Sequence, residues 1–273
     1  MRRSGNPTVA IVIPCFQQRR FLRKAIDSAK GQSVPPDEVI VVDDGSTEDL
    51  SKVTDLYPDV SLVRQENRGL AGARNSGLRA AASDKVIFLD ADDVLHPNAI
   101  ASGLDCFREH PEAAFVYGGF CDVTRKSREQ VYSPVSSHRD LVRTNWIGMI
   151  ATVMFDRLKL LAHDGFDESL GMCEDWDSYL RLSRDHPFAT HPNLVADYVR
   201  HDLNASSNVP ELRKWIEAVR AKEWDRGLDA QDQQAWREGE ELWRARVPDP
   251  KPRSLIERAA RKAARRALRP FRT

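Results

Sequence analysis

The sequence predicts an α/β fold in which a mixed, mostly parallel sheet is flanked by helices and followed by a helical C-terminal extension. Two observations carry this prediction. Short apolar runs rich in β-branched residues alternate with segments of helical periodicity over the first 95 residues, as a parallel sheet with crossover helices requires. Two of these runs end abruptly in carboxylates, which indicates the carboxyl edge of a sheet rather than its interior.

The first part of the chain supplies four strands and the helices between them. Pro14 is expected to end the first strand. Gly45 permits a tight turn after the second, and Ser46 or Thr47 is placed to cap a following helix. Glycines near the start of the predicted helix 69–82 let a ligand approach the backbone closely. The predicted strands are 9–13, 38–42, 60–64 and 86–89, and the clearest helices are 20–30 and 69–82.

The rest of the chain is expected to complete the sheet and to add the extension. A polar loop is expected over 126–134, and a helix begins at Glu174 with acids in its first turn, where the helix dipole favours them. Two polar helices with four tryptophans occupy 210–245. The remaining predicted strands are 113–117, 120–124, 151–155, 188–190 and 195–199, and the remaining helices are 97–109, 138–144 and 157–163.

Charge is divided unevenly along the 273 residues, whose formal net charge is zero. Residues 251–273 hold nine Lys or Arg and one acid, a net of +8, which leaves −8 on residues 1–250. The acidic part gives no reason to expect nucleic-acid binding. The basic tail has an apolar helical stripe, which fits an interfacial helix on an anionic membrane; a solvated helix, or one packed on its own domain, is the alternative.

Cysteine spacing and hydropathy indicate the compartment. The four cysteines are widely spaced, which suggests neither a disulfide framework nor a zinc site and fits a reducing cytosol. The apolar run 9–14 is typical of a strand rather than a signal peptide, and no stretch approaches the ~20 apolar residues of a membrane span. We expect a cytoplasmic protein, also peripheral on the inner face of the membrane through its tail. The predicted units are a main domain 1–205, a helical extension 206–250 and a basic amphipathic tail 251–273.

The most informative stretch is KVIFLDADD, a buried-strand run that ends in Asp90, Asp92 and Asp93. Burial of an unpaired carboxylate is costly, so acids at the end of such a strand need a cation, a hydrogen-bond donor or water. An Asp-x-Asp at this place suits a hard divalent cation that also binds substrate phosphate. A solvated loop rich in Asp is the alternative.

Five motifs in order resemble the family 2 glycosyltransferases of the GT-A fold: VAIVIPCF, EVIVVDDGSTED, ENRGLAGARNSGL, VIFLDADD and CEDWDSYLRL. The resemblance covers roughly residues 8–200 and depends on the order of the motifs, since each alone is weak. It implies a Rossmann-like, nucleotide-binding GT-A sheet that transfers a sugar from a nucleotide-diphosphate sugar. A divalent cation, Mg²⁺ or Mn²⁺, on the Asp-x-Asp would neutralise the leaving diphosphate.

The resemblance also implies a donor site. Asp92 is the expected metal ligand, and Asp90 is a ribose or metal-shell partner. Phe16 stands where the family often places an aromatic ring against the base, with Pro14 at the edge of the same pocket. Arg74 matches a nucleotide contact that its charge suits, and a surface helix position is the alternative. The nucleobase and ribose contacts are completed by the neighbouring acids Asp43 and Asp44.

On the acceptor side, Asp175 matches the carboxylate that serves this family as the general base in a single inverting displacement. Glu174 and Trp176 are further acceptor-side candidates. The alternatives are that the two acids only complement a helix dipole and that the tryptophan packs in the core. His201, in the stretch RHDLNASS, is a candidate metal or diphosphate contact, because neutral imidazole binds divalent cations; a structural histidine is the alternative.

Departures from the family bound the expected function. The Gln-x-x-Arg-Trp motif of the polymer-making members is absent, so one sugar per catalytic event is expected. Residues 205–273 carry no family motif, although such regions usually set the acceptor. The expected partners are a nucleotide-diphosphate sugar and a glycan, lipid-linked or small-molecule acceptor, in cell-surface polysaccharide or glycan assembly.

Two other function classes compete with this interpretation. A nucleotidyltransferase requires a glycine-rich phosphate loop after the first strand, which PCFQQRRF lacks. A non-catalytic nucleotide-sugar binding protein predicts a missing base or metal acid, whereas both acids are present.

Overall fold

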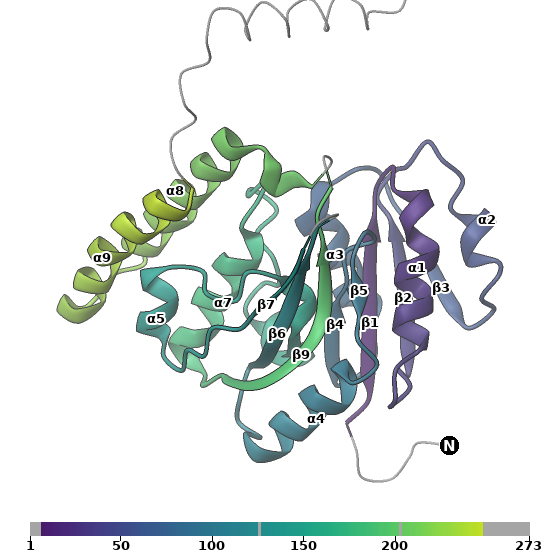
Figure 1. Ribbon diagram of the computed structural model, residues 1–273, viewed down its shortest axis with the longest axis horizontal. Coiled ribbons are helices and arrows are strands. Elements are labelled where there is room, and N and C mark those ends of the chain that lie inside the picture. The colour runs from purple at the N-terminus through teal and green to yellow at the C-terminus, as the bar shows by residue number, and fades with distance from the viewer. Residues whose placement is uncertain (1–6, 125–126, 202–203, 248–273) are drawn as a thin grey trace, which may run out of the picture.

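The computed structural model describes residues 7–124, 127–201 and 204–247. These residues form a curled sheet with helices on both faces (Figure 1). The end of the predicted extension, residues 248–250, and the predicted basic tail, residues 251–273, lie outside the described residues. The strands are β1 Val9–Cys15, β2 Glu38–Asp43, β3 Val60–Arg64, β4 Lys85–Phe88, β5 Val94–Leu95, β6 Phe115–Val123, β7 Arg128–Val131, β8 Val153–Asp156 and β9 Ala189–Val199.

The helices follow the sequence prediction closely. Two one-turn 3₁₀ segments, Ile150–Thr152 and Ala205–Ser207, precede β8 and α8. No helix in the described part of the chain combines the length and hydrophobicity that a membrane span requires. The helices are α1 Arg19–Lys30, α2 Ser51–Thr54, α3 Gly69–Ala80, α4 Ala99–Glu109, α5 His138–Arg143, α6 Arg157–Ala162, α7 Glu174–Asp185, α8 Val209–Asp225 and α9 Ala230–Arg246.

The strand order is β3-β2-β1-β4-β8-β6-β9-β5, with β7 paired to β6. The first four strands, β1 to β4, are all parallel, with β1 between β2 and β4. Beyond them, β8 runs antiparallel to both β4 and β6, while β6 and β9 form a long parallel pair. The predicted mixed, mostly parallel α/β sheet is therefore confirmed, and the carboxyl ends of β1, β2 and β4 meet at one edge.

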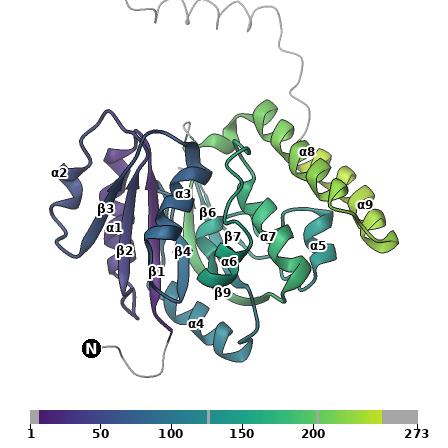
Figure 2. The ribbon, with the colours of Figure 1, turned by 180° about the vertical axis from the view of Figure 1, so that it is seen from behind.

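Both faces of the parallel strands are covered, which explains their unbroken apolar runs. Ile11 and Ile13 of β1 pack with α1 and α4 on one face. Ala10 and Val12 pack on the other face with residues of α3 and α7. Figure 2 shows α3, α6 and α7 together on that second face. Burial of apolar surface from two sides makes these strands the rigid part of the domain.

Two predicted turn features near the first strands are wrong. Pro14 does not end β1 but pairs with Val42 inside it. The pairing of β1 with β4 stops at Val12, so the missing N–H of Pro14 leaves no bond to β4 unmade. Ser46 caps no helix: its Oγ accepts from the backbone N–H of Gln17, and α2 begins five residues later, at Ser51.

Several strands in the second half are longer than predicted. The predicted strands 113–117 and 120–124 are replaced by the single strand β6, Phe115–Val123, because Gly118 and Gly119 stay extended at an irregular register with β9. A Cβ at Gly118 would lie 2.6 Å from the carbonyl oxygen of Asn193, so glycine permits the close approach of β9. The pair 188–190 and 195–199 is likewise one strand, β9.

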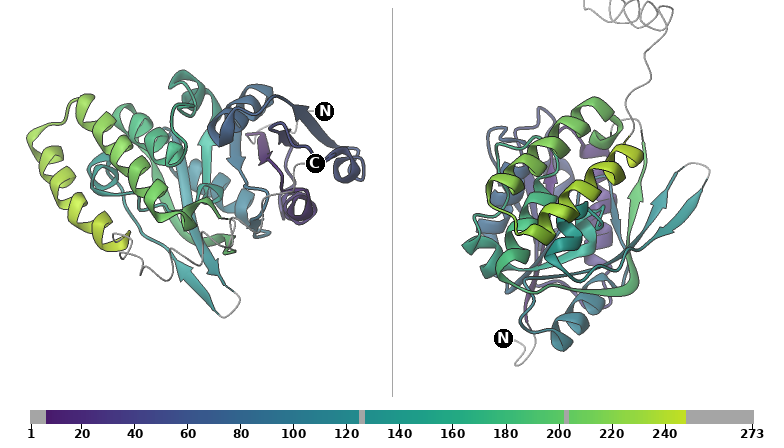
Figure 3. Two further views of the ribbon diagram at one scale, coloured as in Figure 1. Left: turned by 90° about the horizontal axis from the view of Figure 1, so that it is seen from above. Right: turned by 90° about the vertical axis from the view of Figure 1, so that its left-hand side faces the viewer.

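Part of the predicted loop 126–134 is a strand. Residues of β7 pair antiparallel with β6, from Phe120↔Val131 to Val123↔Arg128. The polar composition concealed the strand, since β7 is an edge strand with mostly exposed side chains. Figure 3 shows the β6–β7 hairpin extending from the body of the molecule.

The extension is an antiparallel pair of helices that docks through ion pairs. Figure 1 shows α8 and α9 beyond α5 and α7. Glu223 of α8 is buried and pairs with Arg184 of α7 at 2.5 Å and with Arg226 at 3.1 Å. Gly239 of α9 lies so close to α5 that a Cβ there would overlap the carbonyl oxygen of Arg143. The extension is therefore packed on the main domain.

Candidate active site

A cleft of about 550 Å³ lies at the edge where β1, β2 and β4 end. Acidic side chains gather there because parallel strands present their carboxyl ends on the same side. Most of the predicted site residues line this cleft. They are Pro14, Phe16, Asp44, Arg74, Asp90, Asp92, Glu174 and Asp175.

The two neighbouring acids at the end of β2 have separate positions. Asp44 lines the cleft, and its carboxylate is held by the backbone N–H of Arg68 at 2.8 Å and by Gln65 Nε2 at 2.7 Å. Asp43 is not among the cleft residues. Its Oδ1 accepts from the backbone N–H of Ser46 at 2.8 Å. Asp43 therefore shapes the turn that carries Asp44, instead of lying beside it in the pocket.

An ion-pair chain crosses the floor of the cleft. Arg74 is 3% exposed, and its guanidinium bonds to Asp90 at 2.7 Å and to Glu174 of α7. Burial alone would lower the pKa of Arg74, but the charges of Asp90, Glu174 and Asp175 raise it. Arg74 Nε is a buried donor without a partner among the described residues, and an oxygen from a ligand or from water would satisfy it. Arg74 thus joins the Asp-x-Asp strand end to the start of α7.

Asp92 faces donors from two other parts of the chain. His201 Nε2 lies 2.9 Å and Gln18 Nε2 3.2 Å from Asp92 Oδ2. The imidazole of His201 stacks on Phe21 at 5.0 Å between ring centroids, which fixes its plane. Burial and the neighbouring charge of Asp90 raise the pKa of Asp92. His201 is not among the cleft residues, but its imidazole nitrogen lies beside Asp92, which lines the cleft. A carboxylate oxygen and an imidazole nitrogen so placed suit a divalent cation that takes its other ligands from phosphate and water, so these residues fit the implied metal.

Asp93 has a structural role that the sequence did not indicate. Its carboxylate is 2% exposed and accepts the backbone N–H of Val199, at the end of β9, at 3.0 Å. Burial raises the pKa of Asp93 well above its ordinary range, and the charge of Asp90 adds to this effect. This bond fixes the acidic strand end against β9, whose Tyr198 lines the cleft.

The start of α7 presents two carboxylates to the cleft. Cys173, the residue before the helix, has φ 64°, a left-handed conformation that is uncommon outside glycine and often found at functional sites. Glu174 is buried against Arg74, whereas Asp175 is partly exposed and its carboxylate accepts from the backbone N–H of Trp176. Burial raises the pKa of Asp175 against the lowering effect of Arg74. Asp175 is therefore the carboxylate that remains available to a bound molecule.

Trp176 does not line the cleft, so the acceptor-side prediction for it is wrong and the core-packing alternative holds. Its side chain is 2% exposed, and its Nε1 donates to the carbonyl oxygen of Leu141 at 2.9 Å. The helical spacing explains this result: Trp176 follows Asp175 by one position, which turns it about 100° away, towards α5.

One wall of the cleft was not predicted from the sequence. It comes from three distant segments: the loop before β8, the turn before α7 and the first turn of α8. None of them carries a motif, so only the fold reveals them. The residues are Asn145, Gly148, Met149, Ile150, Gly171, Met172 and Leu212.

The sequence model of glycosyl transferase family 2 matches residues 10–164, more than half of the chain. This chain is a family 2 glycosyltransferase. The glycosyltransferase is 28% identical over 225 residues to the chondroitin synthase of Escherichia coli, a match that covers 76% of this chain and 31% of the relative. The chain thus spans about a third of that relative's length.

Solved structures place the glycosyltransferase in the GT-A fold. The mannosyltransferase PcManGT from Pyrobaculum calidifontis, in complex with GDP-Man and Mn²⁺, matches with a TM-score of 0.64 at 20% identity, over 98% of this chain and 82% of that one. S. aureus TarS residues 1–349, in complex with UDP-GlcNAc, matches with a TM-score of 0.63 at 16% identity, over 88% and 82%. Identities this low show the fold alone, and the predicted GT-A fold is confirmed.

Proposed function

We propose that this glycosyltransferase moves one sugar from a nucleotide-diphosphate sugar to an acceptor hydroxyl in a single inverting displacement. The observation that carries the proposal is that Asp175 lines the same cleft as Asp44, Asp90 and Asp92. One cleft can hold donor and acceptor together, which makes the attack effectively unimolecular. The nucleotide sugars in two similar structures, UDP-GlcNAc with TarS and GDP-Man with PcManGT, support the donor class.

The donor half of the cleft has the features that a nucleotide needs. Phe16 is 47% exposed and offers a ring face to a base. Asp44 offers fixed acceptor oxygens to a ribose or base. Asp90, held by Arg74, lies between this region and the start of α7. These residues orient the sugar nucleotide so that its anomeric carbon faces Asp175.

Asp92 and His201 would hold a divalent cation, Mg²⁺ or Mn²⁺. When bound, such a cation would neutralise charge on the leaving diphosphate. The Mn²⁺ in the PcManGT complex supports this part of the proposal. Gln18 Nε2 donates to the same Asp92 oxygen, Oδ2, at 3.2 Å and limits the rotation of the carboxylate.

Asp175 acts as the general base. It takes the proton from the acceptor hydroxyl as that oxygen attacks the anomeric carbon from the face opposite the diphosphate, so the configuration inverts. Burial raises the pKa of Asp175 and makes the carboxylate a stronger base. Glu174 is occupied by Arg74, which leaves Asp175 for the acceptor.

The unpredicted wall of the cleft, which we call the acceptor wall because it would face the acceptor, and the relatives suggest the setting. Met149, Met172 and Leu212 give this wall an apolar character beside polar groups such as Asn145. A relative named chondroitin synthase supports a role in polysaccharide or glycan assembly. We infer a glycan or lipid-linked acceptor.

The test begins with thermal shifts for UDP, GDP, dTDP and CMP, with and without Mn²⁺, since a ligand of the folded state raises the melting temperature. Asp175→Asn should keep the shift given by the matching nucleotide but lose sugar transfer by about 10²–10⁴-fold. Asp185→Asn, an exposed acid at the other end of α7, is the matched control and should transfer normally. Near-normal transfer by Asp175→Asn would refute the base assignment, and binding that persists without transfer in the wild type would favour a non-catalytic binding protein.

Asp92→Asn tests the metal ligand separately. The variant should lose the Mn²⁺-dependent part of the nucleotide shift, because the carboxylate is one of two protein groups placed to hold the cation. Calorimetry with Mn²⁺ and the matching nucleotide measures the same change. Unchanged metal-dependent binding would contradict the assignment of Asp92.

A further inference from the structure

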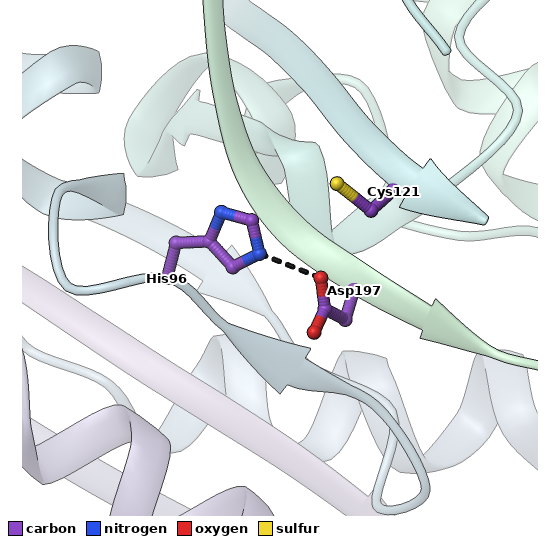
Figure 4. Close-up of side chains that lie close together, drawn as sticks. All are labelled: His96, Cys121 and Asp197. Carbon is purple, nitrogen blue, oxygen red and sulfur yellow. Dashed lines mark hydrogen bonds and ion pairs between the residues drawn. The ribbon is translucent and has the colours of Figure 1, made fainter. Parts of the chain in front are cut away.

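A second cluster of metal-binding side chains lies outside the cleft. His96 follows β5, Cys121 lies on β6 and Asp197 lies on β9, and these three strands are neighbours in the sheet. One ligand atom from each residue lies within 4.8 Å of the others. Figure 4 shows the imidazole and the carboxylate joined by a hydrogen bond, with the sulfur of Cys121 directed towards them. None of the three residues lines the cleft.

The histidine is oriented as in many metal sites. Its Nδ1 lies 3.2 Å from the carbonyl oxygen of Leu194, which can only accept, so Nδ1 carries a proton. A neutral imidazole then directs the lone pair of Nε2 at Asp197 Oδ1, 2.6 Å away. Two acceptors at this distance need a proton or a cation between them. Bonding of the distal nitrogen to a backbone carbonyl is the usual way in which a metal-binding histidine is held.

A protein cation already lies at this place. Arg128 of β7 donates to Asp197 Oδ1 at 2.7 Å, and its Nη2 is 3.3 Å from His96 Nε2. A hydrogen bond with Cys121 and the charge of Asp197 raise the pKa of Arg128, so the guanidinium also lies beside the thiol. The Arg128 side chain is 55% exposed, so it can leave without disturbing the core. The cluster therefore attracts positive charge, and its present cation is replaceable.

We propose that His96, Cys121 and Asp197 bind one divalent transition-metal ion of the zinc class, and that Arg128 takes the place of this ion in its absence. Thiolate, imidazole and carboxylate are zinc ligands, whereas Mg²⁺ prefers oxygen alone. Tetrahedral zinc would separate the nitrogen and oxygen by roughly 3.3 Å, a small change from the distance given above. Binding releases the thiol proton of Cys121 to solvent, and water completes the coordination.

The site would connect the strands that support the cleft. His96 lies four residues after Asp92, and Asp197 lies two residues before Val199, which Asp93 already contacts. A metal here would fix the segment that follows Asp90–Asp93 to β9 and β6, at a place outside the cleft. This role is independent of sugar transfer and is measured without it.

The experiment is a Co²⁺ titration of the full chain with excess Mg²⁺ present to occupy the oxygen-rich cleft. Co²⁺ bound by a thiolate gives a sulfur-to-metal charge-transfer band in the near ultraviolet, which carboxylate and water ligands do not give. The wild type should show this band at one equivalent of Co²⁺, and Zn²⁺ should abolish it. Cys121→Ala should lose the band and bind Zn²⁺ at least about 10-fold more weakly.

Matched variants make the result decisive. Cys106→Ala removes a buried thiol of α4, and Cys15→Ala removes a thiol that lines the cleft; both should keep the band. Arg128→Gln removes the competing cation and should bind Zn²⁺ roughly 1.5- to 5-fold more tightly, as expected for loss of an exposed ion pair. The proposal is overturned if the wild type gives no band, if the band survives in Cys121→Ala, or if Arg128→Gln binds no more tightly than the wild type.

Discussion

Replacement of Arg74 by methionine tests whether the ion-pair chain under the cleft holds the site together. The variant keeps the length of the side chain but leaves Glu174, whose side chain is 4% exposed, without its cation. Removal of one partner from a buried pair costs about 3–5 kcal/mol of unfolding free energy. Asp90 is 31% exposed, so water replaces its lost contact with Arg74. Loss of this second contact therefore adds little to the cost in unfolding free energy. For a chain of this size the melting temperature should fall by roughly 6–20 °C.

The cost should depend on pH in a definite direction. Burial raises the pKa of Glu174, and Arg74 opposes that effect. In Arg74→Met the folded-state pKa of this carboxyl is therefore even further above its unfolded value. A raised carboxyl pKa stabilises the fold below the unfolded pKa and loses that contribution as pH rises towards the folded pKa. In the wild type the pKa of Glu174 is already raised to about 7, so both folded forms keep the proton below this pH. The variant should therefore be closest to the wild type below about pH 7 and lose further stability relative to it as pH rises above 7.

Urea unfolding followed by circular dichroism measures these changes, and a double-mutant cycle isolates the pair. Glu174→Gln keeps Arg74 paired with Asp90, so it should cost only about 1–3 kcal/mol. The double variant removes both charges and should be at least about 1 kcal/mol more stable than Arg74→Met alone. If Arg74→Met were within 1 kcal/mol of the wild type, or if the two single costs simply added, the pair would not be the link described above.

Two further predictions concern the docking of the helical extension. Gly239→Ala forces α9 away from the Arg143 carbonyl and should cost about 1–3 kcal/mol as an overpacked contact. Arg237→Ala, on the same helix, is the control and should change little; equal stability of Gly239→Ala and the wild type would contradict the packing. Burial raises the pKa of Glu223, but contacts with His138, Arg184 and Arg226 outweigh burial and hold the pKa below its usual value. The stability from Glu223 should therefore be complete above about pH 4.5 and be lost as pH falls through the lowered pKa. Glu223→Gln should be less stable than the wild type at pH 7 and lose this difference in acid, as followed by urea midpoints; a constant difference across pH would refute the role of ionised Glu223.

The position of the acids in the proposed donor half of the cleft was predictable because these residues are close together in the sequence. Asp90 and Asp92 follow a buried strand at once, and parallel strands place such ends at one edge. The same reasoning placed Asp43 in the cleft beside Asp44, which the structure does not support. Neighbouring residues at the end of a strand point in different directions, and the sequence does not say which one faces the cleft. Only the backbone around Ser46 decides that Asp43 supports the turn.

The acceptor wall was not predictable, for the converse reason. Ile150, Gly171 and Leu212 are far apart in the chain and meet only after β8, α7 and α8 pack. Their residue types are ordinary core and loop types, so no local pattern distinguishes them. The break predicted between 113–117 and 120–124 shows a related limit. Glycine pairs normally indicate a turn. Here the partner strand β9 approaches so closely that only residues without a side chain fit.

The contact between Gly171 and Trp215 has a consequence for how the enzyme diversifies. A Cβ at Gly171 would lie 2.8 Å from Cζ2 of Trp215, so the turn that carries Cys173 and Asp175 rests directly on α8. Leu212, one turn earlier on α8, completes the acceptor wall. The strands proposed to hold the nucleotide are therefore encoded apart from the helix that shapes the proposed acceptor wall. Exchange of residues 206–247 between relatives should transplant the preference for an acceptor while the preference for a sugar nucleotide stays with the recipient.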